Sequence, residues 1–189
     1  MRNTISLLLG IAVVFSMAVG AAEAQGTINV KETIAGSVVP LFADLDGDGK
    51  EGDLGLCAGK GTLGAYTCTT VSDFDRSAAQ FNTANCPGVV VVELPVAPGG
   101  SHVQMFRNGD LLFWVQDDSV GNYACLDVVT NAWTMVNHYS YVGGTGRFEG
   151  ATGSATMELT GQGLSFDYAG NGVQHGTSGI VTGTIYLAK

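Results

Sequence analysis

Residues 102–116 read His-Val-Gln-Met-Phe-Arg-Asn-Gly-Asp-Leu-Leu-Phe-Trp-Val-Gln, two strand-like runs separated by a short polar turn. Within the turn, Asn108 and Gly109 both tolerate positive φ, which is typical of a two-residue β-hairpin connection. Similar runs recur toward the end of the chain, at 123–129, 133–142, 154–159, 164–168 and 178–187, with a further turn expected at 160–163. This series of hairpins predicts an all-β, antiparallel meander that closes into a roughly eight-stranded barrel.

The N-terminal half of the chain is less regular. Over the whole chain, 28 Gly are spread between short runs as in β proteins, and there are 4 Pro. We expect a helix or irregular segment at 73–85 and, at 89–94, an apolar strand buried on both faces. The other expected elements are strands at 27–34, 38–43 and 65–71 and a Gly/Asp-rich loop at 44–60. The pattern predicts a loop-rich N-terminal extension to one barrel-like domain over residues 25–189.

Alternation along a strand indicates which face is buried. Over 154–159, Ala155, Met157 and Leu159 share one face and polar residues occupy the other, so this strand is expected to be half-buried. Over 133–141 both faces carry amphipathic side chains, so the pattern leaves open which face lines the barrel.

Residues 1–24 have the pattern of a cleavable signal peptide. Arg2 precedes an apolar run over 5–19, and Ala22-Glu23-Ala24 ends the segment. The run has about 15 residues against the roughly 20 that span a bilayer, so we expect cleavage and export rather than a membrane span. The chain has a net charge of −9, which disfavours nucleic acid and anionic lipid as partners.

Four cysteines, Cys57, Cys68, Cys86 and Cys125, follow the leader. An even number in an exported chain favours two disulfides, for which three pairings are possible. We favour Cys57 with Cys68 and Cys86 with Cys125; free buried thiols are the alternative. A zinc site is disfavoured because there is no C-x-x-C pair and the histidines, at positions 102, 138 and 175, are scattered.

An acidic segment over 44–53 predicts a structural calcium site. Acidic residues at positions 1, 3 and 5, Gly at position 6 and a carbonyl at position 7 can converge on one cation. The candidate ligands are Asp44, Asp46, Asp48, the carbonyl of Lys50 and, as the closing carboxylate, Asp53. The segment resembles the D-x-D-G-D-G loops of EF-hands, dockerins and integrin-type propellers, but Gly55 stands where an EF-hand has its bidentate Glu. A solvated acidic turn is the alternative.

A Gly-rich segment over 141–153 lacks the glycine spacing and flanking elements of a nucleotide-binding loop. It resembles the signature of allene-oxide-cyclase and dirigent barrels, including their secreted bacterial members, in Gly143, Gly144, Gly146, Arg147, Phe148, Gly150 and Gly153. The resemblance implies a tight connection between consecutive barrel strands with the Phe packed inward. It also implies apolar small-molecule binding at the barrel mouth, which some members follow with cyclisation.

No set of catalytic residues emerges from the sequence. Ser101 and His102 are strand neighbours, so their side chains point to opposite faces. Arg107, His138 and Glu158 are either surface residues or acid–base groups in the lumen. Aromatic residues that form the core or line a cavity are Phe106, Phe113, Trp114, Phe166 and Tyr168.

Three functions remain open at this point. The first is a secreted, calcium-stabilised, non-enzymatic barrel that binds a small apolar ligand or a surface partner. The second is a cyclase or isomerase of the allene-oxide-cyclase type. The third is a self-assembling extracellular protein, in which homo-oligomers form through strands and the acidic loop.

Overall fold

The computed structural model describes residues 24–40, 51–166 and 172–188, and strands make up most of them. In this part of the chain the helices are two single 3-10 turns, η1 (Arg76–Ala78) and η2 (Gly146–Phe148). The strands are β1 (Ala24–Pro40), β2 (Glu51–Gly61), β3 (Gly64–Phe74), β4 (Gln80–Phe81), β5 (Val91–Pro95), β6 (Ser101–Phe106), β7 (Leu111–Gln116), β8 (Tyr123–Asp127), β9 (Ala132–Gly144), β10 (Thr152–Phe166) and β11 (Gly172–Ala188). No helix among these residues is long and apolar enough to cross a membrane.

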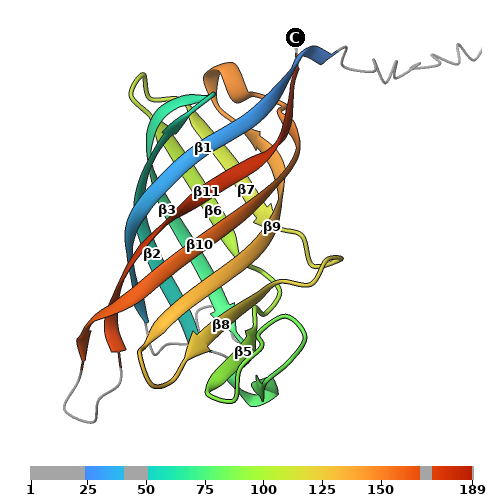
Figure 1. The fold of residues 1–189 in the computed structure, drawn as a ribbon. Coiled ribbons are helices and arrows are strands. Elements are labelled where there is room, and N and C mark those ends of the chain that lie inside the picture. Colours follow the sequence, from blue (N-terminus) through green and yellow to red (C-terminus); the bar gives the residue numbers. More distant parts are fainter. Residues whose placement is uncertain (1–23, 41–50, 167–171, 189) are drawn as a thin grey trace, which may run out of the picture.

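Eight strands form a closed antiparallel barrel, which confirms the predicted architecture (Figure 1). Their order is β1-β2-β3-β6-β7-β9-β10-β11, and the pairing of β11 with β1 closes the circle. The three remaining strands, β8, β5 and β4, continue from the first half of β9 as a small side sheet. The barrel is therefore a meander with two excursions, one after β3 and one after β7.

The N-terminal part contributes more strand than the sequence indicated. Residues 51–60, expected to be loop, form most of β2, which is paired along its length with β3. Likewise, the turn expected at 160–163 lies inside β10. Both segments are Gly-rich, and in each an aromatic ring from the neighbouring strand occupies the space that a glycine leaves by having no side chain. A Cβ on Gly59 or on Gly161 would lie 2.2 Å or 2.1 Å from the rings of Tyr66 and Trp133.

The inner wall of the barrel is made by alternate residues of each strand. On β9 the face that lines the lumen carries Trp133, Met135, Asn137, Tyr139 and Tyr141, which settles the orientation that the sequence left open. On β10, Ala155, Met157 and Leu159 face inward, as predicted. The core also includes Val30, Ile34, Tyr66, Phe106, Leu112, Trp114, Val181 and Ile185.

The prediction that 89–94 is a strand buried on both faces is wrong. Val89 is 84% exposed and Val90 is 38% exposed, whereas Val92 is buried. The run lies in the side sheet, where β5 pairs only with β4 and β8 and nothing in the described chain covers both faces. Only one of its faces therefore packs against the barrel.

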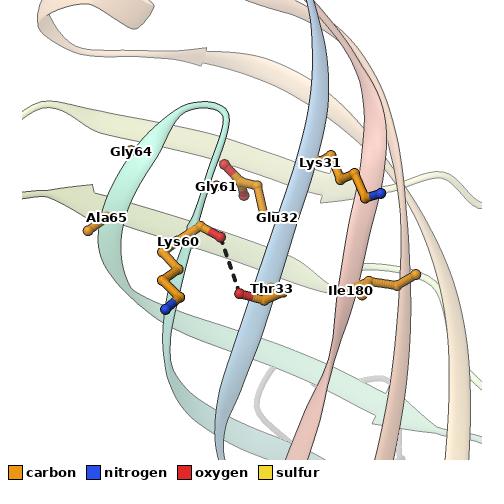
Figure 2. A pocket seen from close by; sticks show the side chains of 8 residues that line it. All are labelled: Lys31, Glu32, Thr33, Lys60, Gly61, Gly64, Ala65 and Ile180. Carbon is orange, nitrogen blue, oxygen red and sulfur yellow. Dashed lines mark hydrogen bonds between the residues drawn. The ribbon is translucent and has the colours of Figure 1, made fainter.

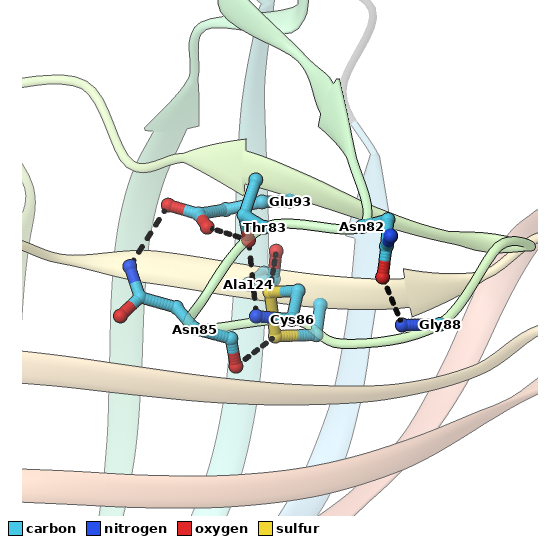
Figure 3. Close-up of a disulfide and its surroundings, with 8 residues drawn as sticks. Asn82, Thr83, Asn85, Cys86, Gly88, Glu93 and Ala124 are labelled. Carbon is cyan, nitrogen blue, oxygen red and sulfur yellow. Dashed lines mark hydrogen bonds between the residues drawn. A yellow bond between two sulfur atoms is a disulfide. The ribbon is translucent and has the colours of Figure 1, made fainter.

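A disulfide between Cys86 and Cys125 ties the segment before β5 to β8, as predicted (Figure 3). The same segment is ordered by Glu93, whose carboxylate accepts hydrogen bonds from Thr83 Oγ1 and from Asn85 Nδ2. Thr83 Oγ1 in turn accepts from the backbone N–H of Cys86 at 3.0 Å. The expected helix or irregular segment at 73–85 resolves into the end of β3, η1, β4 and this loop.

The Gly-rich signature connects β9 to β10 through η2 at the barrel end that contains both Ala24 and Ala188. Phe148 is 1% exposed and packs on Phe106 with ring centroids 4.8 Å apart, so the aromatic residue points inward as the resemblance implied. The Arg147 guanidinium lies over both rings, 4.7 Å and 4.5 Å from their centroids. We call this end of the barrel the closed end.

Candidate functional site

The barrel lumen is filled toward the closed end. Register places Ile34, Gly179, Leu159 and Met135 in one row across β1, β11, β10 and β9. Its three large side chains are only 5–6% exposed. The next row toward the closed end contains Glu32, Val181, Met157 and Asn137, and none of these exceeds 1% exposure. Side chains therefore occupy this half of the lumen, as expected for an eight-stranded barrel.

Side-chain exposure is higher one row further from the closed end. Gly36, Thr177, Gly161 and Trp133 form that row, and all four are half-buried although they face inward. Val38 and His175, paired with each other in the following row, are half-buried too. We call these six residues, Gly36, Val38, Trp133, Gly161, His175 and Thr177, the mouth.

The mouth exists because the strands differ in length. β1 and β11 have 17 residues each and β10 has 15, whereas β6 and β7 have six each. The long strands extend beyond the ends of β6 and β7 (Figure 1). Two of the six positions are glycines whose Cβ sites are already filled, Gly36 by the backbone of Leu56 and Gly161 by the ring of Trp133.

Trp133 supplies the large apolar surface of the mouth. Its ring lies across Gly161, where a Cβ would approach within 2.1 Å of a ring carbon. The imidazole of His175 meets the ring edge-on, with centroids 6.3 Å apart and planes at 73°. Burial lowers the pKa of His175, so its ring is neutral at pH 7 and can donate or accept one hydrogen bond.

A polar cluster lies deeper in the filled half of the lumen. Gln104 Nε2 donates to Glu32 Oε2 at 3.1 Å, and the two residues are 0% and 1% exposed. Removal from water raises the pKa of the Glu32 carboxyl, although the Tyr66 hydroxyl, the Gln104 amide and the Arg147 charge oppose the rise. Burial and the Glu32 charge raise the pKa of both Tyr66 and Tyr141, so both hydroxyls stay protonated. The sequence carried a signal for this cluster, because Glu32 shares a strand face with Val30 and Ile34.

A 530 Å³ groove lies on the outer wall beside the β2–β3 turn. Figure 2 shows that Glu32 is directed toward Gly61 and this turn, while Lys31 and Lys60 extend in different directions. Its lining residues are Lys31, Glu32, Thr33, Lys60, Gly61, Gly64, Ala65 and Ile180. The two cations therefore do not converge on one point of the groove.

The predicted disulfide between Cys57 and Cys68 is present and joins directly paired residues of β2 and β3, with Cα atoms 4.8 Å apart. His102 of β6 lies beside it, stacked on Trp114 with ring centroids 4.6 Å apart. Complete burial lowers the pKa of His102 to about 4, so this imidazole is neutral at pH 7. The sequence did not indicate that these three residues come together.

The other candidate residues are distributed as follows. Asp53 lies in strand β2, opposite Ser72, rather than in a loop. Asp44, Asp46, Asp48 and Lys50 lie outside the described residues, so the calcium site stays a prediction.

The three candidate lumen groups all lie outside the lumen. Glu158 and Arg107 are exposed. His138 is on the outer face of β9, where its Nδ1 is 3.1 Å from Thr156 Oγ1. None of the three can therefore act as an acid or base inside the barrel.

Comparison with known proteins adds no family to this description: neither a scan against protein-family models nor a search of curated proteins finds a match to the chain.

Proposed function

We propose that this chain is an exported, non-enzymatic binding protein of the allene-oxide-cyclase and dirigent barrel type, which holds a small apolar molecule at the mouth. The observation that carries the proposal is the change from a filled lumen to half-buried inward-facing residues at Gly36, Thr177, Gly161 and Trp133. Concave, mostly apolar sites with a few polar groups are the usual form of small-molecule sites.

The ligand class follows from what the mouth contains. Trp133 offers an aromatic face, and Val38 together with the small residues around it provides an apolar floor. His175 is a neutral polar group at the edge of this surface, suited to one hydrogen bond with a hydroxyl or carbonyl. The mouth residues carry no charge at pH 7. A flat, uncharged molecule with one polar group satisfies these features.

A cyclase or isomerase is less well supported. The inward-facing group best suited to acid–base chemistry is Glu32, whose pKa is raised, but it is 1% exposed. Ile34 separates it from the mouth along β1 and is itself 5% exposed. A molecule held at the mouth would not contact the Glu32 carboxyl, so this carboxyl could not act on it as an acid or base.

We further propose that calcium bound by the 44–53 segment stabilises the fold.

Binding can be tested with N-phenyl-1-naphthylamine, a neutral aromatic probe whose fluorescence rises in apolar surroundings. We expect saturable binding of one probe to the purified protein. In a Trp114→Phe variant, Trp133 is the single remaining Trp, since the chain has two. Its emission should then change in proportion to the bound probe, because the probe contacts this ring and not the buried one.

A filled mouth should abolish binding. Thr177 lies between Gly36 and Gly161 in its row, so Thr177→Phe places an aromatic ring where the probe is expected. We expect its affinity to fall at least about tenfold, equivalent to about 1.4 kcal/mol. Thr182→Phe, on the outer face of the same strand, is the matched control and should bind as the parent does. Absence of saturable binding, or equal binding by both variants, would refute the proposal.

A further inference from the structure

The fold assembles three metal-ligating side chains that are far apart in the sequence. β3 pairs with β2 on one side and with β6 on the other, which brings Cys57, Cys68 and His102 to one place on the inner wall. Their two sulfurs and a ring nitrogen all lie within 4.8 Å of one another. The sequence disfavoured a zinc site because it has no closely spaced pair of ligands. In the fold, strand pairing brings together three ligands that are distant in the sequence.

His102 has no other assigned role in the described structure. It is 1% exposed, and neither ring nitrogen has a hydrogen-bond partner among the residues described. A buried imidazole left without partners costs folding free energy, so an apolar residue would be the better choice for packing alone. A buried imidazole with a ring nitrogen within 4.8 Å of two sulfurs therefore calls for a different explanation.

We propose that Cys57, Cys68 and His102 form a zinc site when the disulfide between the two cysteines is reduced. In the oxidised protein the sulfurs bond to each other and the site is closed. The proposal does not rest on ligand binding at the mouth, although the mouth is the route by which reductant and metal reach it. Cys57 is half-buried and pairs with Gly36 of the mouth.

The chemistry balances with an external dithiol as reductant. The dithiol transfers two electrons and two protons to the disulfide, so the S–S bond breaks, two Cys thiols form and the dithiol becomes a disulfide. Zinc then binds both sulfurs and one His102 nitrogen lone pair. The two thiol protons are released to solvent. A water molecule entering from the Cys57 side completes four-coordination.

Zinc is the metal class that this arrangement favours. Two thiolates and Zn²⁺ give a neutral centre, which matters in a buried site where net charge is costly. Tetrahedral zinc holds sulfur at about 2.3 Å and imidazole nitrogen at about 2.0–2.1 Å, so neighbouring ligand atoms are about 3.5–3.8 Å apart. Side-chain rotations of the two cysteines, whose Cα atoms are 4.8 Å apart, can reach this spacing.

The test uses Co²⁺ as a coloured substitute for zinc. Purified protein is reduced with dithiothreitol, freed of it by anaerobic gel filtration and titrated with Co²⁺. We expect a thiolate-to-cobalt absorption band that saturates at one equivalent and disappears when zinc is added. The oxidised protein should give no band. Absence of the band after reduction, or loss of the near-ultraviolet circular dichroism of the fold on reduction, would overturn the proposal.

Matched variants separate this site from the other disulfide. The Cys86→Ser, Cys125→Ser double variant should keep the cobalt band, and the Cys57→Ser, Cys68→Ser double variant should lose it. His102→Asn should weaken binding at least about tenfold. X-ray absorption of the zinc-loaded parent protein checks the ligands without any substitution. Two sulfurs and one imidazole are expected, and a sphere without imidazole would contradict the assignment.

Discussion

Replacement of Glu32 by Gln should make the protein more stable at neutral pH and should remove one specific pH dependence. The Glu32 carboxyl has its pKa raised above the ordinary 4.5, mainly because it is buried. At pH values between 4.5 and the raised pKa, the unfolded chain has released this proton and the folded protein has kept it. The folded state therefore loses stability as pH increases through this window.

The size of the effect follows from proton linkage. One proton retained only by the folded state gives a slope of about −1.4 kcal/mol in unfolding free energy per pH unit. Glu32→Gln has nearly the same shape, and its side-chain carbonyl can still accept the hydrogen bond from Gln104. The unfolding free energy of the variant minus that of the parent should be constant below pH 4.5, then rise by about 1.4 kcal/mol per pH unit and level off above the raised pKa.

The groups around the Glu32 carboxyl determine the width of the pH range over which the stability difference rises. Tyr66, Gln104 and Arg147 lower the pKa of Glu32 and so shorten the window. Tyr141 faces it as a neutral hydroxyl, since its own pKa is raised. Urea unfolding of both proteins at closely spaced pH values gives the difference directly.

A matched control is Glu158→Gln, which removes one negative charge from the outer face of β10. Comparison with this variant separates the effect of a buried carboxyl from the loss of one negative charge on an exposed face. If the curves of the parent and Glu32→Gln run parallel from pH 4 to 8, the carboxyl is solvated in the folded protein. The picture of a filled inner half of the barrel would then be incorrect.

Three further outcomes test other parts of the molecule. Phe148→Ala should cost about 3–5 kcal/mol in denaturant unfolding, because its ring is 1% exposed and packs on Phe106; a loss below about 1 kcal/mol would mean that the closed end is not packed as described. Gly161→Ala should cost about 1–3 kcal/mol and shift Trp133 emission in the Trp114→Phe background, since the new methyl would lie 2.1 Å from the Trp133 ring; unchanged emission would contradict the contact. The Tm should be higher with calcium than with a chelator if the 44–53 segment binds the ion, because a ligand of the native state stabilises it; equal Tm values would refute the calcium site.

Much of the fold was predictable because its signals are local. β6 and β7 lie where the alternation indicated, and Gly109 has the expected positive φ. The two-residue turn predicted at Asn108 and Gly109 is wrong, because the Phe106 N–H donates to the Asp110 carbonyl and so leaves a three-residue loop, 107–109, in which Gly109 alone has positive φ. Both disulfide pairings were chosen correctly among three. The wrong predictions lie in Gly-rich and Val-rich segments. Neighbouring residues in the sequence do not decide whether these segments form strand or loop, or whether they are buried. Residues 51–60 and 160–163 become strand because neighbouring strands and the rings of Tyr66 and Trp133 stabilise them.

The candidate site was less predictable because it depends on which strands become neighbours. By itself, the sequence predicted the β class and the barrel and favoured the cysteine pairing that the structure shows, while export and the calcium site stay predictions. Only the tertiary structure decided that long strands extend beyond short ones to leave a mouth around Trp133 and His175. It also decided that β2, β3 and β6 bring His102 to the Cys57–Cys68 disulfide. Alternation assigns a face to each residue, but barrel closure alone sets which faces meet across the lumen, because that contact joins residues with no proximity along the chain.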